Sequence, residues 1–204
     1  MGVAEPVNRV SGGLKSLNCD GRRGLLLLGL CLGLLLPMLW GEAARLALRY
    51  DRAALAAGQF WRLFTAHVVH LNLRHALVNV LGLALLWALF ARDYRARQWL
   101  VIVLAAALAI DAGLWLFDST VQWYVGSSGV LHGILAAGTL AALRRRQPEG
   151  WLLALILAGK LLYEHFAGAL PFSGSGPVIV SAHVFGVLGG AAAALALRPR
   201  PLPL

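Results

Sequence analysis

Gly126-Ser-Ser-Gly-Val-Leu-His-Gly133 is the stretch that decides the fold expected of this chain. Two hydroxyls and an imidazole stand here between segments made almost entirely of Leu, Ala, Val and Trp. Polar groups are costly inside a bilayer unless they face a protein-lined cavity or a partner helix. The stretch therefore predicts a membrane helix that begins at a polar site within the protein.

The composition is that of an integral membrane protein. Of 204 residues, 59% are hydrophobic and 13% are charged, and this charged share is about half of that in soluble domains. The net charge of +9 does not indicate nucleic-acid binding, because the basic residues form short clusters between apolar runs. Cys19 and Cys31 suggest no disulfide framework, and no Cys or His spacing indicates a metal. No cofactor is expected.

Six apolar runs have about the 20 residues that cross a bilayer as a helix. They cover residues 24–41, 66–91, 98–117, 127–143, 151–168 and 178–197. A signal peptide at the first run is disfavoured because five more runs follow. The sequence predicts an all-α bundle of six transmembrane helices over 24–197, with cytoplasmic tails at 1–23 and 198–204.

The basic clusters predict the orientation of this bundle. By the positive-inside rule, the termini and the loops after the second and fourth runs are expected in the cytoplasm. These clusters comprise Arg9, Lys15, Arg22, Arg23, Arg92, Arg95, Arg97, Arg144, Arg145, Arg146, Arg198 and Arg200. The loop 42–65 breaks the rule, with Arg45, Arg49, Arg52 and Arg62 among aromatic and aliphatic residues. We expect this loop to lie in the outer interface.

Polar residues of three predicted helices lie at a compatible depth. Ser128, His183, and the pair His75 and Asn79 each fall in the first half of a helix that starts at the outer face. At about 1.5 Å per residue, each is on the order of 5–20 Å below the outer surface. Three separate helices thus contribute to one polar level.

Small residues predict which of these helices touch. Glycine pairs spaced by four residues let membrane helices approach backbone to backbone. The pairs are Gly129 with Gly133 and Gly186 with Gly190. Contact through them would bring Ser128 beside His183, and a neutral imidazole can accept the proton of an attacking serine. The Ser128 N–H, His75 and Asn79 could then stabilise the oxyanion.

The remaining buried polar residues have simpler interpretations. Lys160 and Glu164 are four residues apart and are predicted to form a structural ion pair. Asp111 is expected to make a polar interhelical contact and His67 to brace the loop. His70 is expected to brace the loop and is a possible neighbour of the site. His132 could adjoin the site or bond to a neighbouring helix, and the second is favoured.

These residues together resemble the rhomboid family of intramembrane serine proteases. The matching motifs are Trp61-Arg62, His75-x-x-x-Asn79 with His70 five residues before it, Gly126-x-Ser128-Gly129, and Ala182-His183-x-x-Gly186-x-x-x-Gly190. The resemblance implies a Ser128–His183 dyad without a carboxylate, an acyl-enzyme, and oxyanion support from His75, Asn79 and the Gly126–Gly129 loop. Many bacterial members have a tyrosine that stacks on the base at the position of His132.

The stretch from Gly126 to Gly133, the compact size and His70–Leu83 look like the rhombosortase subfamily. That likeness implies cleavage of the C-terminal GlyGly-CTERM anchor of exported proteins in a bacterial inner membrane, with hydrolysis or transfer to a lipid amine as the outcome. The alternatives are a general rhomboid protease for other single-span proteins and a non-catalytic binder of membrane helices. A transporter using Asp111, Lys160 and Glu164 is the least favoured.

Overall fold

The computed structural model describes residues 17–168 and 178–201, and most of these form apolar helices. The elements are α2 (Gly21–Leu35), the 3-10 helix η1 (Leu36–Trp40), α3 (Gly41–Leu48), β1 (Tyr50–Asp51), α4 (Arg52–Ala56), α5 (Arg62–Thr65), α6 (Leu73–Phe90), α7 (Ala96–Phe117), β2 (Trp123–Tyr124), α8 (Ser128–Arg144), α9 (Pro148–Ala167) and α10 (Val180–Ala196). Each of the six predicted apolar runs overlaps one long helix, so the all-α bundle is confirmed. Parts of the predicted tails, 1–16 and 202–204, lie outside the described residues.

The helices have the length and composition of a multi-pass membrane protein. Within residues 17–168 and 178–201, four helical segments are long and apolar enough to cross a bilayer: Gly21–Leu48, Leu73–Phe90, Ala96–Phe117 and Pro148–Ala167. The other two apolar helices, α8 and α10, have 17 residues each. A span predicted to begin inside the membrane at a cavity is expected to be short, and α8 fits this expectation.

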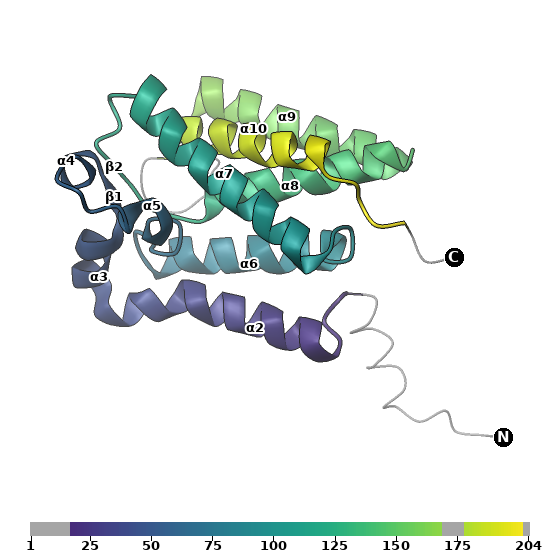
Figure 1. Ribbon diagram of the computed structural model, residues 1–204, viewed down its shortest axis with the longest axis horizontal. Coiled ribbons are helices and arrows are strands. Elements are labelled where there is room, and N and C mark those ends of the chain that lie inside the picture. Colours follow the sequence, from purple (N-terminus) through teal and green to yellow (C-terminus); the bar gives the residue numbers. More distant parts are fainter. Residues whose placement is uncertain (1–16, 169–177, 202–204) are drawn as a thin grey trace.

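The two 17-residue helices, α8 and α10, lie at the centre of the bundle (Figure 1). Helix α10 contacts α7, α8 and α9, whereas α2 packs mainly against α6 at the periphery. The first and last described residues lie at the same end of the bundle, opposite α3, α4 and the two strands (Figure 1). An even number of membrane crossings requires this arrangement of the ends.

Glycines bring α8 and α10 together, as the sequence predicted. A Cβ atom added at Gly186 would overlap the Gly129 carbonyl oxygen, and one added at Gly190 would overlap the Gly133 carbonyl. A Cβ at Gly133 would lie 2.6 Å from the Gly186 carbonyl oxygen. Backbone meets backbone along two turns, and any larger residue would force these helices apart.

The loop 42–65, called loop one from here on, is a folded cap in which all four arginines make hydrogen bonds or ion pairs. Arg45, Arg52 and Arg62 donate to backbone carbonyls, and Arg49 pairs with Asp51. These contacts give the four arginines that break the positive-inside rule a structural role. The cap also holds the approach to α8, because β1 pairs antiparallel with β2 at Tyr50↔Tyr124 and Asp51↔Trp123.

The opposite end gathers the other basic clusters. Arg145 forms an ion pair with Asp93 at 2.7 Å and donates to the Arg200 carbonyl. Arg144 donates to three carbonyls at the end of α10, those of Ala194, Leu195 and Leu197. The basic segments that follow α6, α8 and α10 therefore lie at one end of the molecule.

Candidate active site

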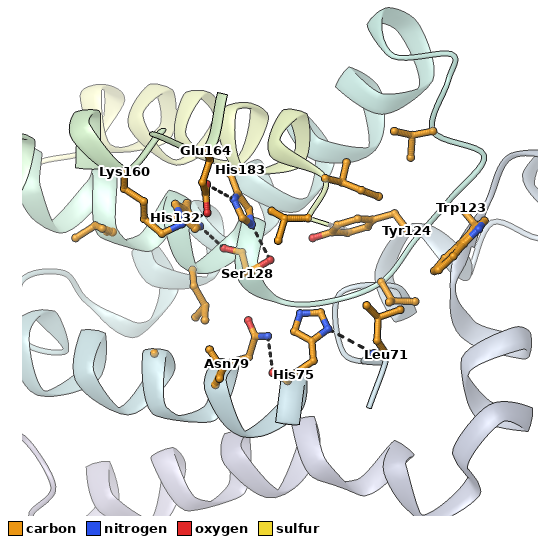
Figure 2. A pocket seen from close by; sticks show the side chains of 18 of the residues that line it. Leu71, His75, Asn79, Trp123, Tyr124, Ser128, His132, Lys160, Glu164 and His183 are labelled. Carbon is orange, nitrogen blue, oxygen red and sulfur yellow. Dashed lines mark hydrogen bonds and ion pairs between the residues drawn. The ribbon is translucent and has the colours of Figure 1, made fainter. Parts of the chain in front are cut away.

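A cavity of about 790 Å³ opens between α6 on one side and α8, α9 and α10 on the other (Figure 2). The segment 120–125, which includes β2, forms part of its wall. Apolar side chains provide most of the lining, among them Val78, Leu85, Leu131 and Leu135. A few polar side chains converge at one place in this wall, as is typical of binding sites. They are His75, Asn79, Ser128, His132, Lys160, Glu164 and His183.

The structure brings the predicted serine and histidine together. Ser128 is the first residue of α8, and His183 lies in the first turn of α10. The Ser128 Oγ is 2.9 Å from the His183 Nε2, and His183 is 5% exposed. The contact of α8 and α10 through their glycines positions this pair.

The histidine also has a carboxylate partner, which corrects the expectation of a base without one. The His183 Nδ1 lies 2.8 Å from the Glu164 Oε2. Glu164 is 1% exposed and lies near the end of α9, one turn after Lys160. Lys160 does pair with it, through Oε1, so the predicted ion pair forms but uses only one carboxylate oxygen. The expectation was wrong because the face of α9 that carries Glu164 turns toward α10.

These contacts set the tautomer of His183. An ionised carboxylate only accepts hydrogen bonds, so the proton of a neutral His183 ring lies on Nδ1 and points at Glu164. The unprotonated Nε2 then faces the Ser128 hydroxyl and can accept its proton. Serine, imidazole and carboxylate thus form one continuous chain (Figure 2).

A turn that requires glycine presents the serine to the cavity. Gly126 has φ of +119°, a conformation that side chains disfavour, and a Cβ there would lie 2.9 Å from the His75 ring. The turn is held by the Gly126 N–H, which donates to Ala66 O, and by the Tyr124 hydroxyl, which donates to Gly126 O at 2.6 Å. Glycine at 126 therefore serves both backbone shape and close approach.

His75 and Asn79 line the same cavity from α6 (Figure 2). The Leu71 N–H donates to the His75 Nδ1, which leaves the proton of a neutral ring on Nε2 as a donor. The Asn79 amide donates one hydrogen to the His75 carbonyl at 2.9 Å and retains a second. Both side chains thus keep a hydrogen-bond donor, as the predicted oxyanion role requires. That role itself stays a prediction.

His132 lies within the site, contrary to the favoured interpretation. Its ring stacks on the ring of His183, with centroids 4.1 Å apart and planes at 17°. Its Nδ1 bonds to the Ser128 carbonyl of its own helix at 2.7 Å rather than to a neighbouring helix. One ring face of the base is therefore covered by an aromatic side chain at the position where the family often has tyrosine.

The other predicted histidines brace the loop behind the site. The His70 Nε2 is 3.3 Å from the Ser127 Oγ, and the His70 ring meets His75 edge to face. His67 faces Asp111 at 3.4 Å, which is the polar interhelical contact expected of Asp111.

The start of α10 is tied to the end of α7 by a hydrogen bond from the Ser181 hydroxyl to Asp118. Hydroxyl donors, first among them Ser181, lower the pKa of Asp118.

Three groups of the site could be considered metal ligands. Ligating atoms of His132, Glu164 and His183 all lie within 4.8 Å of one another. An ion bound to a histidine nitrogen lies close to the plane of that ring, about 2.0–2.1 Å from the nitrogen. Because the two imidazoles are stacked, no single ion can lie in both ring planes. The arrangement suits hydrogen bonding better than ligation.

Comparison with known proteins is consistent with this geometry. The family model described as the rhomboid domain matches residues 57–200. The rhomboid protease GluP of Bacillus subtilis is 28% identical over 151 residues, and YdcA of the same organism, provisionally named a rhomboid protease, is 24% identical over 136. The matches cover 72% and 67% of this chain. They cover 28% of GluP and 66% of YdcA, so the chain spans less than two thirds of either relative.

Proposed function

The chain belongs to the rhomboid family, and from that premise we propose that it is an intramembrane serine endopeptidase. The observation that carries the proposal is the Ser128–His183 hydrogen bond of 2.9 Å at the wall of a cavity between helices. A serine held on an unprotonated imidazole nitrogen is an activated nucleophile. Two side-chain donors, on His75 and Asn79, lie in the same cavity and can stabilise negative charge.

The proposed reaction proceeds in two steps. The Ser128 Oγ attacks the scissile carbonyl carbon while its proton moves to the His183 Nε2. The C–N bond then breaks, and that proton passes to the leaving amine, which yields an acyl ester on Ser128. Water then gives a proton to Nε2 while its oxygen attacks the ester carbon. The C–Oγ bond breaks, the proton passes from Nε2 back to the Ser128 Oγ, and the carboxylic acid product leaves. If the amine of a lipid headgroup attacks instead, the product becomes an amide-linked lipid anchor.

The proposed substrate is the C-terminal GlyGly-CTERM segment of exported proteins, as in rhombosortases. Support comes from the resemblance of the Gly126–Gly133 and His70–Leu83 stretches to that subfamily. The largely apolar cavity wall suits a substrate helix, and small residues at the cut, such as Gly-Gly, are what the resemblance implies. The partners are thus a transmembrane substrate segment and the lipid bilayer.

The proposed location is a bacterial inner membrane with both termini in the cytoplasm. The basic segments after α6, α8 and α10 share one end of the bundle, and the positive-inside rule assigns that end to the cytoplasm. The 120–125 segment and loop one then face the periplasm. The cavity that this segment lines would open to the periplasmic side.

A cleavage assay in membranes tests the proposal. The reporter carries a Gly-Gly pair, an apolar helix and a basic tail at its C-terminus, and the product is identified by intact mass. Cleavage at the glycines by the wild type but not by Ser128→Ala is expected, and added product mass would reveal transfer to a lipid. A matched reporter with Val-Val at the same position is the control.

Equal cleavage of both reporters would favour a general rhomboid protease. No cleavage of any single-span reporter, with no labelling of Ser128 by a serine-reactive probe, would favour a non-catalytic binder.

A further inference from the structure

We propose that Glu164 is the positioning residue of the base, so that Ser128, His183 and Glu164 act as a triad whose carboxylate is held in place by Lys160. This inference rests on the proposed function and extends it. It starts from the burial of Glu164, which is 1% exposed although glutamate is among the residues least often buried.

A buried carboxylate is tolerated only when its charge is paired and its oxygens are hydrogen-bonded. Lys160 on the same helix forms an ion pair with one oxygen of Glu164, and the Lys160 side chain is 28% exposed. The second oxygen is directed at the His183 Nδ1 at 2.8 Å. A local ion pair alone would need no such contact, because a carboxylate on the outer face of α9 could meet Lys160 equally well.

The charge arrangement fits the needs of the base. When Nε2 takes the serine proton, His183 becomes an imidazolium with a proton on each nitrogen. Glu164 remains ionised, accepts the Nδ1–H and stabilises the new positive charge, and no proton moves to it. Lys160 stays protonated and keeps Glu164 turned so that Oε1 faces the ammonium and Oε2 faces the ring.

Lys160 makes this proposal unusually testable, because it dictates the orientation of an amide placed at 164. In Glu164→Gln, the amide oxygen is expected to face Lys160, so that the NH₂ group faces the His183 Nδ1. The NH₂ donor makes Nδ1 accept a hydrogen bond, so the ring proton moves to Nε2. A protonated Nε2 can no longer take the proton of Ser128. Lys160→Met in the same chain frees the amide to turn and to offer its oxygen to Nδ1.

The experiment measures the rate constant for phosphonylation of Ser128 by a fluorophosphonate probe, followed by intact mass in detergent. In that step the Oγ–P bond forms, fluoride leaves, and the serine proton passes to Nε2. The readout needs no natural substrate. Glu164→Gln is expected to label about 10³–10⁴-fold more slowly than the wild type, the loss typical when an orienting carboxylate becomes an amide. The double variant Lys160→Met/Glu164→Gln is expected to recover at least about tenfold of that loss.

Asp111→Asn is the matched control, because it makes the same change in the other buried histidine–carboxylate pair, which does not line the cavity. It is expected to label within about threefold of the wild type, since it leaves the tautomer of His183 unchanged. Labelling of folded Glu164→Gln at the wild-type rate, or a double variant no faster than Glu164→Gln, would overturn the triad. If Glu164→Gln does not fold, the double variant decides, because loss of the carboxylate charge is there matched by loss of the ammonium. A wild type that does not label at all contradicts the proposed function itself, which separates the two failures.

Discussion

Two sets of the same side-chain types meet at the Gly126–Gly129 loop. In the first set, one imidazole joins a serine and a carboxylate: His183 contacts Ser128 at 2.9 Å and Glu164 at 2.8 Å. In the second set, the serine and the carboxylate belong to different rings. His70 contacts Ser127 at 3.3 Å, and His67 contacts Asp111 at 3.4 Å.

The difference between the two sets lies in connection rather than composition. A serine becomes nucleophilic when the ring that takes its proton is itself oriented through its other nitrogen. Only His183 meets this condition among the described residues, and only the first set lines the cavity. In the second set, the His67 Nδ1 and the Asp111 Oδ1 find no hydrogen-bond partner within the described residues. We therefore assign the first set to chemistry and the second to bracing the loop.

Replacing the serine-bonded histidine of each set, His183 or His70, should give the largest difference in cleavage rate between the two sets. We expect His183→Ala to lower the rate of substrate cleavage by at least about 10⁴-fold, because the nucleophile loses its base. We expect His70→Ala to lower it by no more than about tenfold, since it loses the hydrogen bond to Ser127 and the edge-to-face contact with His75 but leaves the base in place. Cleavage rates of the two purified variants in liposomes measure the contrast. Similar losses in both, with both folded, would contradict the division into two sets.

The contact between α8 and α10 should matter to the first set alone. A Cβ added at Gly186 would overlap the Gly129 carbonyl, so Gly186→Ala is expected to separate Ser128 from His183. Overpacking of this kind costs about 1–3 kcal/mol of stability, and cleavage should fall with it. Thermal unfolding in detergent and cleavage rates measure both effects. Gly159→Ala on α9 is the control, because no heavy atom lies within 4 Å of the added Cβ there. Equal stability of the two variants would show that the close approach is not required.

The stacking of His132 on His183 should have the smallest effect. An aromatic contact of this kind is worth about 0.5–1.5 kcal/mol, so we expect His132→Ala to lower cleavage by about 2–13-fold. His132→Phe keeps the stack but loses the hydrogen bond to the Ser128 carbonyl. Recovery of most of the rate in His132→Phe would assign the effect to the stack. A rate as low as that of His132→Ala would assign it to the hydrogen bond.

Much of this architecture could be predicted from sequence because it depends on periodic patterns. Apolar runs of bilayer length predicted the helices, and the two Gly-x-x-x-Gly pairs predicted the contact of α8 with α10, which the structure confirms. From that contact the neighbourhood of Ser128 and His183 followed. Loop one was harder, since its short helices are held by arginine-to-carbonyl bonds between residues far apart in the chain.

The parts that could not be predicted depend on helix rotation. Lys160 and Glu164 have the spacing of a local ion pair, and this pattern gives no sign of which face of α9 meets α10. The only available signal for Glu164 was its place in an apolar run, where ionisable residues are functional candidates. For His132, the signal was its position four residues after Ser128, on the same side of α8. Both roles depend on packing between α8, α9 and α10 that no local pattern encodes.

The most direct test of the central claim is to identify which of two adjacent serines reacts. Ser127 and Ser128 each lie beside a histidine, but only Ser128 lies beside one that is also bound to a carboxylate. The protein is treated with a fluorophosphonate, and fragmentation of the peptide that contains Gly126–Gly133 locates the adduct. We expect the phosphonyl group on Ser128 alone, and no adduct after His183→Ala. An adduct on Ser127, or labelling of Ser128 that persists without His183, would contradict the account.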